Sequence, residues 1–282
     1  MPLVRTADLV TFGRGVAAFN VITLEHAEAI IAGAEAADTA VICQISENAV
    51  KFHHGRLGPI AAATAALAEN SSAPVGLHLD HVTDVGLLHQ AADHGFGSVM
   101  YDGSHHDYAE NVARTAEAAA WAHAHGLWLE AELGEVGGKD GAHAHGARTD
   151  PGEATAFVAA TGVDALAVAV GSSHAMTDRT ATLDHALIWE LRAALPVPLV
   201  LHGSSGVPDD ELRQAVLSGM VKINIGTALN VAFTGAVRES LQAHVDPRKY
   251  LAPARDAMSA VVAHLLKVIA AGTDDTRSLY AT

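Results

Sequence analysis

The chain has 282 residues, half of them hydrophobic, and its formal net charge is −15 at pH 7. This acidic balance argues against nucleic acid and anionic membranes as partners, although a local pocket can still bind a small anion. The one cysteine, Cys43, lies in an apolar run and cannot form an internal disulfide, which predicts a reduced thiol in the cytoplasm. The N-terminal residues predict no secretion signal, and no uninterrupted apolar stretch is long enough to cross a membrane.

Short runs rich in apolar and β-branched residues alternate with alanine-rich stretches along the whole chain. The runs predict strands over 16–20, 40–45, 75–79, 97–101, 127–132, 164–170, 198–202 and 220–224. Helix-forming residues predict helices over 24–37, 107–125 and 229–270, the last region holding more than one helix.

The strands recur at the spacing of βα units, in which each strand returns through a helix to a parallel neighbour. Eight such units in roughly 250 residues is the size of a (β/α)8 barrel. No linker or change of composition divides the chain. We therefore expect an α/β fold, a TIM-type (β/α)8 barrel that forms a single domain over residues 1–282, with extra C-terminal helices.

In such barrels the catalytic groups lie at the carboxyl ends of the strands. Nearly every predicted strand ends in a polar group or a glycine loop: Ser46, Asp80, His81, Asp102, Glu132, His174, His202 with the loop 203–206, and the loop 224–227. The amino ends of the predicted strands show no such pattern. This segregation predicts a functional site at one end of the barrel.

Three histidines carry the strongest of these signals. His81, His174 and His202 each follow a different predicted strand, and three imidazoles with an open position form a common catalytic zinc site. The chain has 18 histidines, so chance placement is the alternative. The adjacent Asp80 favours the site, because a carboxylate beside a metal can transfer protons. His78 lies two residues earlier on the same strand face and is expected below the site, as a donor that orients a ligand.

Two carboxylates and three loops complete the predicted site. Asp102 and Glu132 are expected to orient metal ligands or to bind a second cation; the alternative is that they are solvated loop residues. The loops 171–174, 203–206 and 224–227 offer backbone N–H groups and hydroxyls that suit a phosphate. Each loop taken alone is usually just a turn.

Taken together, these motifs resemble the class II, zinc-dependent ketose-bisphosphate aldolases of the fructose- or tagatose-bisphosphate type. The matching segments run in order along nearly the whole chain and include L-H-L-D-H (77–81), V-M-Y-D-G-S-H (99–105), L-V-L-H-G-S-S-G-V (199–207) and K-I-N-I-G-T (222–227). The resemblance implies reversible aldol cleavage of a ketose phosphate to dihydroxyacetone phosphate and an aldehyde. It also implies Zn2+, often with Na+ or K+ nearby, and a homodimer or homotetramer.

The resemblance assigns a role to each matching position. It makes His81, His174 and His202 the zinc ligands and Asp80 the catalytic acid/base, with Asp102 and Glu132 available to an alternative or second metal. A mobile loop would bring in Asp140 as a second acid/base. The implied substrate-binding residues are Ser46, Gly171, Ala175, Gly203, Ser204, Ser205, Asn224, Ile225, Gly226 and Thr227.

The sequence departs from the family pattern at two of these positions. Ala175 replaces the glycine that usually follows the second zinc histidine, and Asp140 replaces the usual glutamate. The departures leave open which ketose is cleaved and whether it carries one or two phosphates.

Other functions stay open at this point. Lys222 is expected to face into the barrel, where a lysine can form a Schiff base with a ketose. A barrel-type metal hydrolase fits less well, because the first strand lacks a His-x-His pair. A non-catalytic sensor of metal or sugar phosphate would have no need for Asp80.

Overall fold

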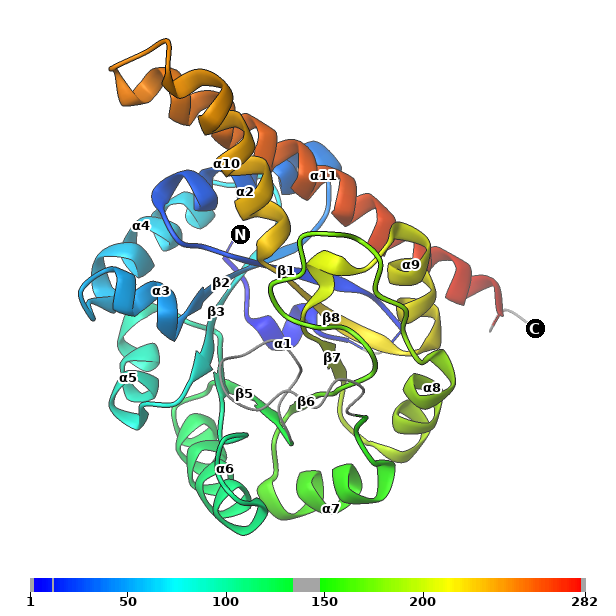
Figure 1. Cartoon of the computed structure of the whole chain (residues 1–282). Coiled ribbons are helices and arrows are strands. Elements are labelled where there is room, and N and C mark those ends of the chain that lie inside the picture. Colours follow the sequence, from blue (N-terminus) through cyan, green and yellow to red (C-terminus); the bar gives the residue numbers. More distant parts are fainter. Residues whose placement is uncertain (1–2, 12, 134–147, 280–282) are drawn as a thin grey trace.

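In the computed structural model, which describes residues 3–11, 13–133 and 148–279, the strands close into a parallel barrel with β8 paired to β1. Figure 1 looks down this barrel, with the helices arranged around the outside. The strands are β1 (Val16–Asn20), β2 (Val41–Ser46), β3 (Val75–Val82), β4 (Ser98–Tyr101), β5 (Trp128–Glu132), β6 (Ala165–Ala167), β7 (Leu199–Leu201) and β8 (Met220–Ile225). The predicted TIM-type barrel is confirmed.

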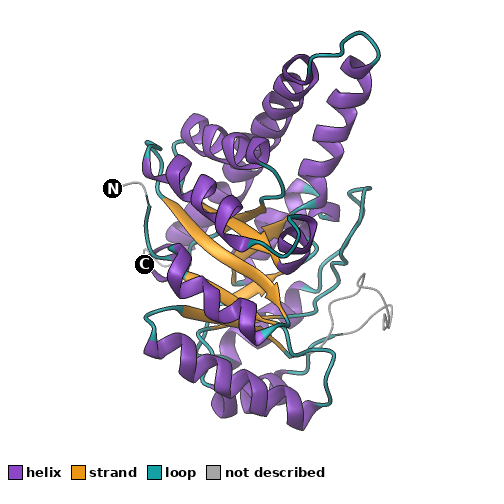
Figure 2. Cartoon of the chain, turned by 90° about the vertical axis from the view of Figure 1, so that its left-hand side faces the viewer, coloured by secondary structure: helices purple, strands orange, loops and turns teal. Residues whose placement is uncertain are grey.

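Helices alternate with the strands, and most of them cover the barrel on the outside (Figure 2). They are α1 (Thr6–Leu9), α2 (Leu24–Ala37), α3 (Glu47–Phe52), α4 (Leu57–Glu69), α5 (Val85–Gln90), η1 (Ala91–His94), α6 (Tyr108–Ala124), α7 (Pro151–Thr161), α8 (His185–Ala194), η2 (Ser204–Gly206), α9 (Asp209–Ser218), α10 (Thr227–Leu241) and α11 (Pro247–Leu279). The predicted C-terminal helices correspond to α10 and α11, which form a hairpin that projects beyond the ring of helices.

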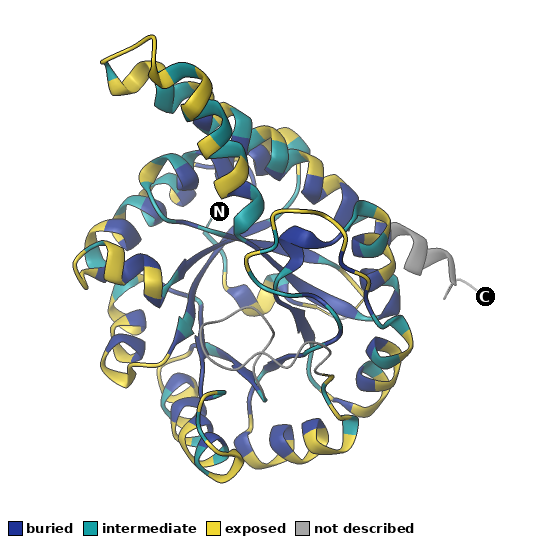
Figure 3. Cartoon of the chain, viewed as in Figure 1, coloured by how far each residue is buried: buried dark blue, intermediate teal, exposed yellow. Residues whose placement is uncertain are grey.

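The main hydrophobic core lies between the strands and the helices. Figure 3 colours the buried residues dark blue, along the strands and on the helix faces turned toward them. Successive side chains of a strand point to opposite faces, so alternate residues such as Phe19, Leu77 and Leu129 point outward into this layer. Cys43 is fully buried there, and burial raises the pKa of its thiol to about 12. The apolar run around Cys43 is thus part of the core.

The other strand face lines the barrel interior, which is polar toward the carboxyl ends of the strands. Small or branched residues such as Ala18, Ile42 and Val200 form separate apolar clusters inside. The pairs Gln44–His78 and His78–Ser98 lie in register on neighbouring strands, and all three side chains are buried. A barrel interior is normally packed with branched apolar side chains. Here polar side chains replace the apolar ones toward the carboxyl ends of the strands, which marks this end of the barrel as the one that holds the site.

The segment Pro247–Thr273 of α11 is long and apolar enough to cross a membrane by length and composition alone. In the structure, however, α11 packs against α2, α9 and α10, and its apolar side chains Met258, Val262, Leu266 and Ile269 are buried in the core. The apolar composition of this helix is accounted for by packing. Gly33 of α2 is one contact point, because a Cβ there would lie 2.6 Å from Cβ of Val262.

This contact predicts that Gly33→Ala destabilises the fold, although alanine is the better helix former. Crowding should cost about 1–3 kcal/mol against a gain of about 1 kcal/mol in helix propensity. In the matched control Gly235→Ala, on α10, a Cβ meets nothing within 4 Å, so only the gain is expected. Denaturant unfolding of both variants measures the difference, and equal stabilisation of both would show that α2 and α11 are not packed so closely.

Candidate active site

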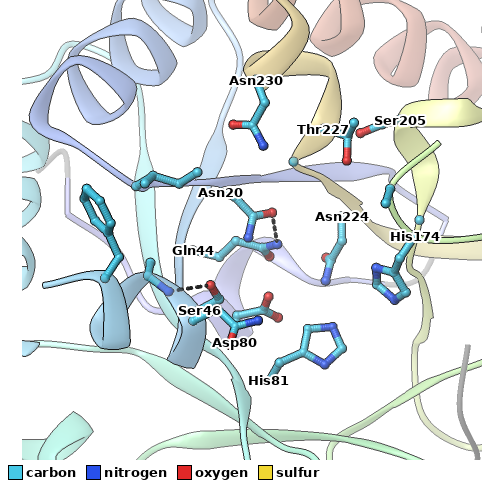
Figure 4. Close-up of a pocket in the computed structure, with 17 residues that line it drawn as sticks. Asn20, Gln44, Ser46, Asp80, His81, His174, Ser205, Asn224, Thr227 and Asn230 are labelled. Carbon is cyan, nitrogen blue, oxygen red and sulfur yellow. Dashed lines mark hydrogen bonds between the residues drawn. The ribbon is translucent and has the colours of Figure 1, made fainter. Parts of the chain in front are cut away.

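A β-bulge in β3 brings Asp80 and His81 to the same side of the barrel. Leu79 pairs with Val99 and Val82 with Tyr101, so two residues of β3 lie opposite one residue of β4. His81 has a left-handed backbone with φ of 49°, a costly conformation for a residue other than glycine. In a regular strand these neighbours would point to opposite faces. With the bulge, both side chains line the same pocket (Figure 4).

His81, His174 and His202 meet at the carboxyl end of the barrel. One ring nitrogen from each lies within 4.8 Å of the others, which is close enough for the three to share a metal ion. The ring centroids of His81 and His202 are 4.7 Å apart, with the planes inclined at 67°. The structure thus brings together the three histidines that the sequence predicted as ligands. His81 Nδ1 lies 2.8 Å from Asp102 Oδ2, which leaves Nε2 of that ring to face a metal.

The carboxylates Asp102 and Glu132 are both buried, so the interpretation as solvated loop residues is wrong. With His81 they form a second group whose ligand atoms lie within 4.8 Å of one another. Ser104 Oγ donates to Asp102 Oδ1 at 2.6 Å and steadies that carboxylate. Glu132 Oε2 lies 3.6 Å from His202 Nδ1. Their placement fits either role expected from the sequence, orientation of a ligand or a second cation position.

Below the three histidines lies a layer of fully buried ionisable groups. His202 Nε2 donates to Glu130 Oε1 at 2.9 Å, and Lys222 Nζ donates to Glu130 Oε2 at 2.8 Å. None of these side chains has measurable exposure to solvent. Lys222 does face inward as predicted, but it is ion-paired rather than directed into the pocket. Sequence reasoning missed Glu130, which was detectable because it lies two residues before Glu132 on the same strand face.

His78 lies in this layer too, with Nε2 3.7 Å from Asp80 Oδ1. Ser98 Oγ donates its proton to Thr6 Oγ1. Ser98 Oγ therefore accepts a hydrogen bond from His78 Nδ1, at 2.7 Å. The position below the site is as expected, but the hydrogen bond goes to Ser98 and not to a histidine of the trio. Burial, and next the Lys222 ammonium, hold the pKa of His78 well below its ordinary value, so this ring is neutral.

A pocket of about 680 Å³ opens above the histidines. Of the expected substrate-binding residues, those that line it are Ser46, Ala175, Gly203, Ser205, Asn224, Gly226 and Thr227. Three others do not: Gly171 is packed against Thr182, Ser204 lines a neighbouring pocket, and Ile225 is buried in the outer core. Asp140 falls outside the described residues.

The pocket also contains amide side chains that the sequence did not single out. Gln44 Nε2 donates to Asn20 Oδ1 at 2.9 Å, and Asn48 and Asn230 lie farther out. Phe52, at the end of α3, is 63% exposed beside them. Only Asn20 and Gln44 could have been found from the sequence, because they end predicted strands or lie one residue from an end; the helix residues carry no such signal.

Two backbone positions hold the His174 loop in place. Ala175 has φ of 59°, a left-handed conformation that glycine adopts without strain, which gives a physical reason for the family's usual glycine. Gly203 has φ of 66°, and a Cβ there would lie 2.5 Å from the carbonyl of Ser173. The two loops that carry His174 and follow His202 therefore pack backbone to backbone.

A closed (β/α)8 barrel with an imidazole trio, buried carboxylates and glycine loops at the carboxyl ends of its strands is the architecture of a barrel enzyme whose site could hold a metal ion. Residues 7–273 match the sequence model of the family described as fructose-bisphosphate aldolase class-II. The chain belongs to this family and is a class II aldolase, a carbon–carbon lyase.

Individual relatives agree with this assignment. The chain is 40% identical over 250 residues to a fructose-bisphosphate aldolase of Geobacillus stearothermophilus, covering 86% of this chain and 87% of that one. It is 37% identical over 280 residues to the fructose-bisphosphate aldolase of Thermus caldophilus, covering 89% and 91%. The crystal structure of the YdjI aldolase from Escherichia coli K12 superposes with a TM-score of 0.79 at 32% identity, over 92% of both chains.

The contact between Gly203 and Ser173 predicts that Gly203→Ala displaces the His174 loop. On the expectation that the trio binds zinc, the variant should bind this ion less tightly than the parent protein, as measured by competition with a chromophoric chelator. Gly162→Ala is the matched control, because Gly162 also has a left-handed φ of 69° but a Cβ there meets nothing within 4 Å. It should lose about 1–2 kcal/mol of stability and keep its zinc affinity. Equal zinc affinity in both variants would contradict the proposed contact.

Proposed function

We propose that this chain catalyses the zinc-dependent, reversible aldol cleavage of a ketose phosphate to dihydroxyacetone phosphate and an aldehyde. Fructose-1,6-bisphosphate is the first substrate to test, because the relatives carry that name, and tagatose-1,6-bisphosphate is the second. The observation that carries the proposal is the trio His81, His174 and His202, whose ligand atoms lie within 4.8 Å of one another beside Asp80.

The residues present fit a zinc ion. Three neutral imidazoles and an open fourth position are a frequent ligand set of catalytic zinc. Two of the rings are already held by carboxylates, His81 by Asp102 and His202 by Glu130, as histidines that bind metals usually are. A bound zinc ion would supply a Lewis acid that stabilises negative charge on the substrate oxygens during carbon–carbon cleavage.

Asp80 is the proposed acid/base that moves the proton of the substrate hydroxyl. Its carboxylate lines the pocket beside His81, and Oδ1 has no hydrogen-bond partner among the described residues. In cleavage it would accept the proton of the hydroxyl next to the breaking bond, and in condensation return it. Asp140 is retained as the proposed second acid/base that exchanges the carbon-bound proton.

The phosphate of the dihydroxyacetone half is proposed to bind where η2 meets α10. Gly226 and Thr227 at the start of α10 line the pocket, so the helix N-terminus points its N–H groups at it. Ser205 Oγ accepts from the backbone N–H of Ala228 at 3.0 Å and joins the two elements. A monovalent cation near this cradle, and assembly as a homodimer or homotetramer, are part of the proposal through the family resemblance.

The surroundings of Lys222 favour zinc chemistry over a Schiff base. A Schiff-base lysine must reach the substrate carbonyl as a neutral amine. Lys222 is instead fully buried, and its Nζ donates to Glu130. A non-catalytic sensor is disfavoured as well, because it would have no need for the Asp80 carboxylate that lines the pocket.

Metal removal tests the proposal directly. Dialysis against a strong chelator should abolish cleavage of fructose-1,6-bisphosphate, and added zinc should restore it. Borohydride with the same substrate should leave the mass of the protein unchanged, because no imine forms. Activity that survives removal of the metal, together with a borohydride adduct on Lys222, would establish the Schiff-base mechanism instead.

Asp80→Asn tests the proton transfer separately from metal binding. The amide keeps the shape of the side chain but cannot accept the proton, so kcat should fall by about 10²- to 10⁴-fold while zinc content stays at the parent level. Asp84→Asn is the control, since Asp84 caps α5 outside the pocket and asparagine caps equally well. Steady-state kinetics with metal analysis decide the matter, and a zinc-loaded Asp80→Asn protein at parent turnover would refute the role.

A further inference from the structure

The buried group below the metal ligands has a charge arrangement that the proposed chemistry does not use. Glu130 is fully buried and lies between two hydrogen-bond donors. His202 Nε2 approaches Oε1 at 2.9 Å, and Lys222 Nζ approaches Oε2 at 2.8 Å. The next nearest ionisable group, His78 Nε2, lies 3.9 Å from Oε2, outside hydrogen-bond distance.

We infer that Glu130 and Lys222 are positioning residues that select the tautomer of His202, so that Nδ1 is the nitrogen offered to the metal. This inference rests on the proposed zinc site. A carboxylate only accepts hydrogen bonds, so the neutral ring must carry its proton on Nε2. The lone pair is then left on Nδ1, which lies 3.6 Å from Glu132 Oε2. His81 is held the other way round, through Nδ1, and offers Nε2.

Lys222 has a separate part in the arrangement. A carboxylate buried without a compensating charge is strongly unfavourable, and the Lys222 ammonium provides that charge at the second oxygen. Because both oxygens are engaged, the carboxylate cannot turn away from His202. Lys222 on β8 therefore fixes the carboxylate of Glu130 on β5, and this carboxylate fixes the imidazole of His202 after β7.

Glutamine cannot replace Glu130 in this position, although it has the same shape. A carboxylate presents an acceptor to each of its two neighbours, whereas an amide presents one acceptor and one donor. If the amide oxygen accepts from His202, the NH2 group points at the Lys222 ammonium. If the oxygen accepts from Lys222, the NH2 group favours a lone pair on Nε2 and places the ring proton on Nδ1, where the metal should bind.

The test is the zinc affinity of Glu130→Gln in the full chain, measured by competition with a chelating indicator. We expect it to fall by about 10- to 100-fold. The double variant Glu130→Gln/Lys222→Met removes the competing donor, so it should recover most of that affinity. Asp164→Asn is the matched control: this carboxylate accepts from His123 at 2.9 Å just before β6, at the opposite end of the barrel, and zinc affinity should not change.

Replacing both members of a buried ion pair can also restore stability by itself, so the rescue is read on the ring. Tautomer selection predicts that the His202 proton returns to Nε2 in the double variant, as seen in ¹H–¹⁵N spectra of the ring, whereas a merely structural role predicts a recovery of stability with no change of tautomer. Parent-like affinity in a folded Glu130→Gln protein, or no rescue, would overturn the inference. Failure of the parent chain to bind zinc would instead overturn the proposed function, so the two failures are distinguishable.

If Glu130→Gln does not fold, the parent protein itself decides. With ¹¹³Cd in place of zinc, long-range ¹H–¹⁵N spectra of ¹⁵N-labelled protein show which nitrogen of each ligating ring couples to the metal. The assigned His202 ring is expected to couple through Nδ1, with its proton on Nε2. Coupling through Nε2 would overturn the inference without any substitution.

Discussion

The site depends on one irregularity of the backbone, the bulge that lets Asp80 and His81 share a face of β3. A regular strand alternates its side chains, so either the proposed acid/base or the proposed metal ligand would point into the outer core. The left-handed conformation of His81 is unfavourable by itself and persists because the neighbouring strand fixes it on both sides, at Leu79–Val99 and Val82–Tyr101. Local strain is thus tied to the geometry that the proposed chemistry needs.

Below the bulge, the barrel replaces apolar packing with a layer of polar groups joined by hydrogen bonds. Lys222, Glu130 and His202 form one chain of hydrogen bonds, and His78, Ser98 and Thr6 form another. Buried ion pairs contribute little to stability compared with well-packed apolar residues. Their presence in the interior is better explained by orientation, since a ring held by a carboxylate presents one defined nitrogen to its other side.

The glycine loops also position the site, through contacts of the backbone. The loop after β7 and the loop that carries His174 approach so closely that a single added methyl group at Gly203 would overlap Ser173. Ser205 in turn ties η2 to the first turn of α10. The histidine trio and the proposed phosphate cradle are therefore built from adjoining segments, which places the charged end of a ketose phosphate beside the group that would stabilise its carbonyl.

The sequence by itself determined the barrel, because its apolar runs recur at the spacing of βα units, and it determined which strand ends carry His81, His174, His202 and Asp80. It could not determine which side of β3 these neighbours face, since that depends on a register shift against β4. Nor could it show that Lys222 is engaged by Glu130, because the two residues come together only when the sheet closes. Asn48, Phe52 and Asn230 likewise lie on helices, where helix packing alone brings them to the pocket. Local patterning fixes elements and their ends, whereas contacts between distant strands exist only once the barrel has closed, and those contacts decided the geometry of the site.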